Sequence, residues 1–180
     1  MDFTRLARRQ FFGLGLTAGF ALACAPARAA LAQGPRSLQF ESLHTGERLT
    51  ATYWAAGAYM PEELQRINHV LRDHRTGDIK PIDPGLLDLL VMLRERLDAR
   101  APFQIISAYR SPATNAMLAA HSSGVARQSL HTQGLAIDLR VPERTLTSVR
   151  DAALSLRGGG VGFYPRSDFV HVDVGRVRAW

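Results

Sequence analysis

The sequence predicts a compact single domain of the α+β class, in which helices flank a small antiparallel sheet. Three observations predict it. The chain of 180 residues is 46% hydrophobic and 21% charged, the balance of a globular domain with a sizeable core. Segments with helical spacing of apolar residues come mostly before segments in which apolar and polar residues alternate. No linker composition or internal repeat divides residues 37–180, so we expect one domain there.

A hairpin and two helices are expected first. Residues 37–44 and 48–54 alternate apolar and polar side chains around the turn-like Thr45-Gly46-Glu47, which predicts two paired strands. A proline and two acids open residues 61–75, whose apolar residues have helical spacing. The apolar stripe of residues 84–100 predicts the longest helix and a core element.

Shorter elements follow in the second half of the chain. The patterns predict strands over residues 103–108, 135–141, 161–164 and 169–174, and helices over residues 114–120 and 144–156. The last two strands come after a run of three glycines. Strands that follow one another so closely are expected to pair antiparallel.

Residues 1–30 have the features of a cleaved export signal. A basic head precedes an apolar stretch of about fifteen residues and the small-residue run Ala27-Arg28-Ala29-Ala30. A membrane-spanning helix needs about 20 apolar residues, so we expect no permanent span after processing; the alternative is a basic N-terminus that stays anchored in the membrane. The run Arg8-Arg9-Gln10-Phe11-Phe12 resembles a twin-arginine signal, which predicts an exported, periplasmic protein.

The only cysteine of the chain, Cys24, lies inside this signal. The processed protein would contain none, which excludes a thiol nucleophile, a zinc-thiolate site and a structural disulfide. The segment Ala21-Leu22-Ala23-Cys24 also resembles a lipoprotein processing site. Because Ala21 stands where leucine is preferred, lipid anchoring through Cys24 is the less favoured interpretation.

The net charge does not indicate a nucleic-acid partner. The charge of +6 falls to +3 once residues 1–29, with four arginines and one aspartate, are removed. Such an excess is too weak to argue for binding to a polyanion.

Residues that can do chemistry gather on two of the predicted strands. In residues 135–141, strand alternation places Ala136, Asp138 and Arg140 on the face opposite the apolar side chains. In residues 169–174 it does the same for Phe169, His171 and Asp173. If the two strands are neighbours, Asp138 and His171 converge away from the core, and the turn at Gly134 brings in His131.

Two imidazoles and one carboxylate are ligands that suit Zn²⁺. Three protein ligands leave the fourth tetrahedral position open, as a catalytic site requires. Each residue alone could be an ordinary hydrogen-bonded polar residue, but the joint pattern predicts a zinc site at His131, Asp138 and His171, carried by the small sheet.

Several ordered motifs resemble those of the MepK-like (YcbK-like) murein endopeptidases. This family is in the group of D-alanyl-D-alanine peptidases, which are related in fold to lysostaphin and the hedgehog signalling domain. The likeness spans about residues 37–180. The motifs are Tyr109-Arg110-Ser111-Pro112-Ala113-Thr114-Asn115, His131-x-x-Gly134-x-Ala136-x-Asp138, Gly160-Val161-Gly162-Phe163-Tyr164-Pro165 and Phe169-Val170-His171-Val172-Asp173.

The resemblance implies roles for particular residues. His131, Asp138 and His171 match the three zinc ligands of the family. Arg110 matches an arginine that holds a substrate carboxylate or the developing oxyanion. Its neighbours Tyr109 and Ser111 belong to the same motif and are expected to take part in substrate binding.

The general base is left open between two aspartates. Many relatives have a glutamate three residues before the last zinc histidine, and Asp168 stands at that place. Asp168 is one methylene shorter and has the wrong strand parity, so it would need to lie on a bend. Asp173 shares the face of His171 and is the competing candidate, as base or as the acceptor that orients an imidazole.

We therefore expect a zinc-dependent hydrolase that cleaves amide bonds in peptide cross-links of peptidoglycan. Two alternatives stay open. One is a carboxypeptidase of the D-alanyl-D-alanine type, and the other is a zinc-binding or wall-binding module without activity.

Overall fold

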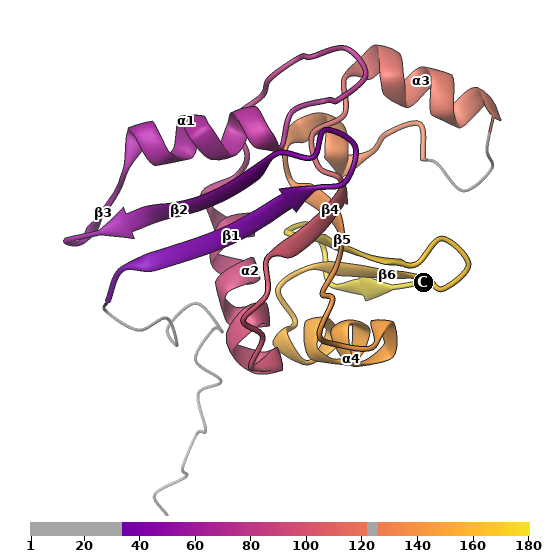
Figure 1. Cartoon of the computed structure of the whole chain (residues 1–180). Coiled ribbons are helices and arrows are strands. Elements are labelled where there is room, and N and C mark those ends of the chain that lie inside the picture. The colour runs from indigo at the N-terminus through magenta and orange to yellow at the C-terminus, as the bar shows by residue number, and fades with distance from the viewer. Residues whose placement is uncertain (1–33, 122–125) are drawn as a thin grey trace, which may run out of the picture.

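The computed structural model describes residues 34–121 and 126–180 (Figure 1). The predicted export signal and Cys24 lie outside these residues. Within them, no helix combines the length and the hydropathy needed to cross a membrane. The elements in chain order are β1 (Arg36–Ser42), β2 (Arg48–Ala55), β3 (Ala58–Tyr59), α1 (Pro61–Val70), α2 (Pro84–Leu97), β4 (Phe103–Ser107), α3 (Pro112–His121), the short 3₁₀ helix η2 (Leu130–Gln133), β5 (Ala136–Arg140), α4 (Leu146–Leu156), β6 (Gly160–Tyr164), β7 (Phe169–Asp173) and β8 (Arg178–Ala179).

The strands of the described residues form one sheet in the order β3-β2-β1-β4-β5-β7-β6-β8. Most neighbours are antiparallel, but β1 pairs with β4 and β6 pairs with β8 in parallel. The α+β class is confirmed, whereas the sheet is mixed and larger than the small antiparallel one expected. Alternation could not predict these parallel pairs, because both helices α1 and α2 separate β1 from β4, and β8 has only two residues.

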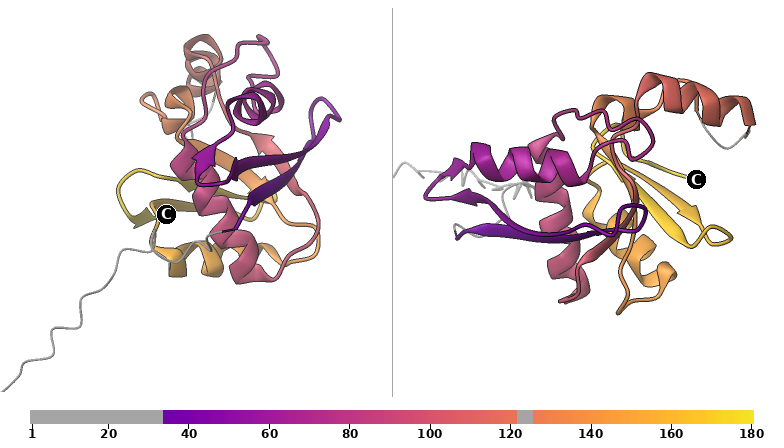
Figure 2. Two further views of the ribbon diagram at one scale, coloured as in Figure 1. Left: turned by 90° about the vertical axis from the view of Figure 1, so that its left-hand side faces the viewer. Right: turned by 45° about the horizontal axis from the view of Figure 1, so that its top comes forward.

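Three helices bury one face of this sheet. α1 packs on β2, α2 packs on β1 and on α4, and α4 packs on β6 and β7 (Figures 1 and 2). Each fully buried leucine or phenylalanine here stabilises the fold by about 1.5–3 kcal/mol. Fully inaccessible side chains of this core include Leu38, Phe40, Leu86, Leu90 and Leu139. Because the apolar side chains of β5 and β7 face these helices, their polar side chains lie on the opposite face of the sheet.

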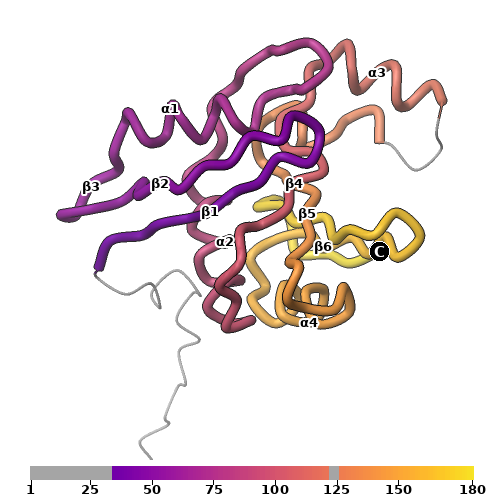
Figure 3. Tube along the Cα trace, in the orientation of Figure 1, coloured from indigo at the N-terminus to yellow at the C-terminus, as the bar shows by residue number. Residues whose placement is uncertain are grey.

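Two helices end earlier than the sequence predicts. α1 ends at Val70 instead of near residue 75 because Asp73 turns the chain, and its carboxylate accepts the backbone N–H of Arg75. α2 ends at Leu97 because Asp98 adopts a left-handed conformation, with φ of 45°. The Cα trace in Figure 3 shows α3 beyond this body of the domain, leading to η2 and β5.

Candidate metal centre

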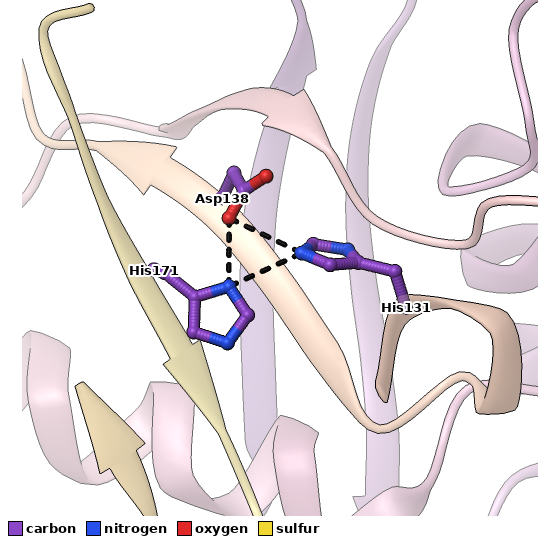
Figure 4. Close-up of side chains that lie close together, drawn as sticks. All are labelled: His131, Asp138 and His171. Atoms are coloured by element: carbon purple, nitrogen blue, oxygen red, sulfur yellow. Dashed lines mark hydrogen bonds and ion pairs between the residues drawn. The ribbon is translucent and has the colours of Figure 1, made fainter. Parts of the chain in front are cut away.

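Strands β5 and β7 are antiparallel neighbours, and Asp138 lies directly opposite His171 in their register. The two side chains therefore leave the sheet on the same face, as the alternation of both segments requires. Oδ1 of Asp138 lies 2.9 Å from Nδ1 of His171 (Figure 4). Adjacent strands thus supply two of the three predicted ligands.

The short helix η2 brings in the third, His131. The Ser129 side chain accepts the backbone N–H of His131 at the start of η2, and Gly134 ends it with φ of 73°. A Cβ atom on Gly134 would lie 2.3 Å from the carbonyl oxygen of Pro81. Only glycine fits both this conformation and this close approach, so the turn that the sequence placed at Gly134 is required here.

In each imidazole, the ring nitrogen that points away from the other two predicted ligands is held by a hydrogen-bond acceptor. Nδ1 of His131 donates to the carbonyl oxygen of Ala108 at 2.6 Å, and Nε2 of His171 donates to Oδ2 of Asp173 at 3.1 Å. A carbonyl and a carboxylate can only accept, so these two ring nitrogens carry the hydrogens. In the neutral imidazoles, Nε2 of His131 and Nδ1 of His171 then present lone pairs to the centre.

Three acceptor atoms therefore meet at one point. Nε2 of His131 lies 3.1 Å from Nδ1 of His171 and 3.2 Å from Oδ1 of Asp138. All three residues are buried, with exposed fractions of 3%, 8% and 5% for His131, His171 and Asp138. Neutral imidazole lone pairs and a carboxylate facing each other repel unless a cation lies between them. The residues present thus fit a metal ion with two nitrogen ligands and one oxygen ligand.

The electrostatics of the centre favour an ionised carboxylate. Burial alone would raise the pKa of Asp138, but without a cation in the centre the positive charge and the hydrogen bonds that His131 and His171 offer it hold this pKa well below its ordinary value. Burial would also lower the pKa of His171, whereas its contacts with Asp138 and Asp173 raise that pKa on balance. A permanently negative oxygen at this point is suited to a cation.

Asp173 supports the centre from behind. The residue is fully buried, and its carboxylate accepts the backbone N–H groups of Gly160 and Gly175. Both terminal nitrogens of the Arg178 guanidinium also donate to it, at 3.1 and 2.7 Å. Burial opposes its ionisation, but the contacts with His171 and Arg178 hold the pKa of Asp173 well below its ordinary value. Of its two predicted roles, this geometry matches the acceptor that orients the imidazole.

Arg110 lies on the other side of Asp138. Its guanidinium is 3.5 Å from Oδ2 of that carboxylate and donates to the side-chain oxygen of Asn115 at 3.3 Å. Burial lowers the pKa of Arg110 and the neighbouring Asp138 opposes this, so the group stays charged. Its Nε atom is buried and has no hydrogen-bond partner among the described residues.

A cleft of about 500 Å³ opens over the centre. The predicted residues His131, Asp138, His171 and Arg110 line it. Three residues without a predicted role line it as well, Tyr164, Arg178 and Trp180. The glycines at every second position of β6, Gly160 and Gly162, could have indicated these three residues in the sequence. Glycines on one face of a strand leave room for side chains of neighbouring residues.

The structure places two residues of the Arg110 motif, Tyr109 and Ser111, away from the cleft. Tyr109 is 9% exposed and packs in the apolar core. Ser111 is 1% exposed; its N–H donates to Asp73, and its hydroxyl accepts the N–H of Thr114 at the start of α3. Of this motif only Arg110 lines the cleft. The Tyr109 side chain points into the core, and Ser111 is engaged by Asp73 and Thr114.

Asp168 lies on a turn before β7, with φ of 54°. A general base at this position would require such a bend, because regular strand alternation would place Asp168 on the face opposite His171. Its side chain is 63% exposed and forms an ion pair with Arg140 of β5. Asp168 is not among the residues that line the cleft.

The fold and the centre define a class. Two histidines and one aspartate that line a cleft, on the face of the α+β sheet opposite α1, α2 and α4, are the ligand set expected of a metal-dependent hydrolase. A model of the M15 peptidase family described as peptidoglycan L,D-endopeptidase MepK matches residues 30–180. The chain belongs to this family of peptidases, which confirms the resemblance found in the motifs.

Individual relatives agree with the family. The chain is 48% identical over 175 residues to the peptidoglycan L,D-endopeptidase MepK of Escherichia coli (strain K12) and to that of Shigella flexneri, with 96% of each chain covered. It is 42% identical over 147 residues to the probable peptidoglycan L,D-endopeptidase MepK of Haemophilus influenzae, covering 81% of this chain and 79% of the relative. No solved structure matches significantly.

Proposed function

We propose that the protein is a zinc-dependent endopeptidase that hydrolyses an L,D amide bond in the peptide cross-links of peptidoglycan. The observation that carries this proposal is the meeting of three acceptor atoms, from His131, Asp138 and His171, under a cleft. The relatives supply the substrate class, since their names specify peptidoglycan and an L,D bond.

Zinc is the metal that the donor set favours. Two imidazole nitrogens and one carboxylate oxygen are typical of catalytic zinc, whereas magnesium and calcium prefer oxygen ligands. When bound, the ion supplies Lewis-acid polarisation of the scissile carbonyl and activation of water. The protein contributes the orientation of the ligands, through Ala108 behind His131 and Asp173 behind His171.

Arg110 is suited to bind an oxygen of the substrate. It is a buried cation at the edge of the cleft, and its charge lies beside the ligand Asp138. A fixed cation in a site that excludes water stabilises negative charge as it develops, and needs no reorganisation to do so. We assign to Arg110 the binding of the developing oxyanion or of a substrate carboxylate.

The group that transfers the proton stays a prediction between Asp168 and Asp173. The oxygens of Asp173 are already engaged by His171, Arg178 and two backbone N–H groups. Asp168 has an exposed carboxylate, but its partner is Arg140 and it lies outside the cleft. Their variants, described below, distinguish the two.

Digestion of purified sacculi tests the function. The purified protein is incubated with sacculi, with chelator alone, and with chelator followed by excess zinc, and the fragments are identified by mass spectrometry. Metal-dependent cleavage of cross-links between an L and a D centre is the expected result. Release of terminal D-alanine alone would identify a carboxypeptidase. Binding to sacculi without any fragment would identify a non-catalytic module.

We further propose export to the periplasm by the twin-arginine route, in keeping with a peptidoglycan substrate. The support is the basic, apolar and small-residue pattern of residues 1–30. Replacing both Arg8 and Arg9 with lysine should retain the precursor inside the cell. Normal processing of that double variant would indicate the general secretory route instead.

A further inference from the structure

An aromatic wall, formed by Tyr164, Phe169 and Trp180, stands beside the metal centre. All three residues line the cleft. Tyr164 and Phe169 are paired across the β6–β7 hairpin and their rings stack, with centroids 4.6 Å apart. The Trp180 ring lies 5.2 Å from the imidazole of His171, centroid to centroid. The wall is therefore in direct contact with a predicted metal ligand.

Gly162 leaves the space that the aromatic wall occupies. It lies opposite His171 in the hairpin, and a Cβ atom there would be 2.8 Å from ring atoms of both Tyr164 and Trp180. The two rings thus occupy the space that a side chain would need. A residue without a side chain at this register position lets both rings lie next to the centre.

Trp180 is held firmly although half of it is exposed. Its exposed fraction is 50%, but its backbone carbonyl accepts the N–H of Phe163 and its own N–H donates to Val161. The guanidinium of Arg178 lies 4.7 Å from the ring centroid, a cation-π contact. The Trp180 ring is therefore exposed to the cleft and yet fixed in orientation, which lowers the cost of ordering it when a ligand binds.

The hydrogen bond inside the wall has a defined direction. Nε1 of Trp180 donates to the hydroxyl oxygen of Tyr164 at 2.7 Å. An indole N–H can only donate, so the hydroxyl hydrogen of Tyr164 is not used in this bond. No described side chain accepts it. Tyr164 and Arg110 both line this cleft, so the phenol and the guanidinium can meet the same ligand.

We propose that Tyr164 donates a hydrogen bond to a carbonyl oxygen of the peptide substrate, and that Trp180 is the positioning residue that directs this hydroxyl. The proposal rests on the function proposed above, because it needs a peptide in the cleft. A neutral donor suits a neutral amide oxygen, while the charged Arg110 suits the developing oxyanion or a substrate carboxylate.

Removal of the hydroxyl measures the donor. Tyr164→Phe keeps the ring that stacks on Phe169 and should lower kcat/KM on a purified cross-linked muropeptide about 10- to 100-fold. Zinc content and melting temperature should match those of the wild type, since the hydroxyl touches no ligand. This variant alone tests the proposal, because its conservative change does not depend on the folding of any Trp180 variant.

A double-mutant cycle tests the positioning role. Trp180→Phe keeps a ring but removes the N–H that directs the hydroxyl, and should lower kcat/KM about 3- to 10-fold. If Trp180 acts through Tyr164, the same change in a Tyr164→Phe background should have little further effect. A purely structural role of Trp180 would give effects that add.

Fluorescence provides a readout that does not need turnover. The chain has two tryptophans, and Trp54 lies on β2, where it contacts Tyr59 and Arg36 and does not line the cleft. Trp54→Phe therefore serves as the matched control for loss of an indole, and leaves Trp180 as the only tryptophan. Muropeptide is added to the Trp54→Phe protein in the presence of chelator, and the emission of Trp180 should change. Adding Tyr164→Phe to this variant should raise the dissociation constant obtained from that change.

Distinct outcomes overturn distinct claims. Wild-type kcat/KM for Tyr164→Phe, full additivity in the cycle, or unchanged Trp180 emission with saturating muropeptide would each refute this inference. A wild-type protein that cleaves no cross-link in the presence of zinc would instead refute the proposed function. Loss of zinc from Tyr164→Phe would also overturn the inference, since the tyrosine would then support the metal and not the substrate.

Discussion

Oδ2 of Asp173 lies 3.1 Å from Nε2 of His171, so the carboxylate fixes one side of the imidazole and directs the other toward Asp138. Asp173 is itself fixed by Arg178 and by two backbone N–H groups. The orientation of a predicted metal ligand therefore depends on a buried carboxylate that contacts the outer side of that ligand and does not line the cleft.

Metal binding should require both histidines. His131→Ala and His171→Ala each remove one of three ligands, so the purified variants should retain little zinc after dialysis. Metal content measured by mass spectrometry tests this. His69→Ala is the matched control, because His69 is an exposed histidine paired with Glu47, and it should bind zinc like the wild type. Full occupancy in either ligand variant would refute the assignment.

The two aspartates should respond differently. Asp173→Ala removes the acceptor of His171 and should lower metal affinity or activity about 10- to 100-fold, with partial recovery in excess zinc. Asp168→Ala should keep its zinc and most of its turnover, because the Asp168 side chain is exposed and pairs with Arg140 outside the cleft.

Turnover at saturating zinc is the measurement that separates them. A loss of about 10² to 10⁴ in Asp168→Ala with full zinc content would identify Asp168 as the general base, contrary to this expectation. Wild-type zinc affinity and turnover in Asp173→Ala would show that His171 does not depend on the carboxylate behind it.

Arg110 should contribute to chemistry without holding the metal. Arg110→Gln removes the buried charge, so kcat/KM on wall peptides should fall about 10²- to 10³-fold while zinc content is retained. Steady-state kinetics with metal analysis test this. Arg166→Gln, at an exposed arginine of the turn after β6, is the matched control and should have wild-type kinetics. Similar losses in both variants would point to a general effect of charge.

Asp73 should contribute to stability above pH 4. Burial alone would raise its pKa, but hydrogen bonds from Thr114, Arg75 and Ser111 lower it to about 2. A depressed pKa in the folded state stabilises the protein above the unfolded value near 4, and this contribution is lost as the pH falls toward 2. Asp73→Asn should cost about 1–3 kcal/mol at pH 7.

Urea unfolding of wild type and Asp73→Asn at pH 7 and at pH 3 tests this sign. The difference in unfolding free energy between the two proteins should shrink at the lower pH. A constant difference would show that ionisation of Asp73 does not contribute.

Gly134→Ala should destabilise the fold more than other changes of glycine to alanine at positive φ. Its φ is 73°, and the new Cβ would lie 2.3 Å from the carbonyl oxygen of Pro81. Gly57→Ala is the matched control, since its φ is 81° and its Cβ would meet nothing within 4 Å. The control should lose about 1–3 kcal/mol and Gly134→Ala more. Equal losses in thermal unfolding would show that the approach to Pro81 is relaxed cheaply.

Much of the site could be predicted from the sequence. Alternation along β5 and β7 gave the face on which Asp138 and His171 lie, because side chains of a strand point to opposite faces with a period of two. The resemblance of the motifs predicted the family that the comparisons confirm. The helical spacing in α2 and α4 predicted the elements that cover the other face of the sheet.

The sequence by itself thus determined the faces of the strands, the class of the fold and the residue types of the predicted ligands. Only the tertiary structure decided which strands are neighbours, and with that the parallel pairs of β1 with β4 and β6 with β8. The tertiary structure also decided which aspartate orients a predicted ligand and which one lies in solvent. Asp173 is buried beside Arg178 and Asp168 is exposed beside Arg140, although both are aspartates close to His171 in the sequence. The physical reason is that periodicity is a local property of the chain, whereas burial and hydrogen-bond partners come from segments far away in it.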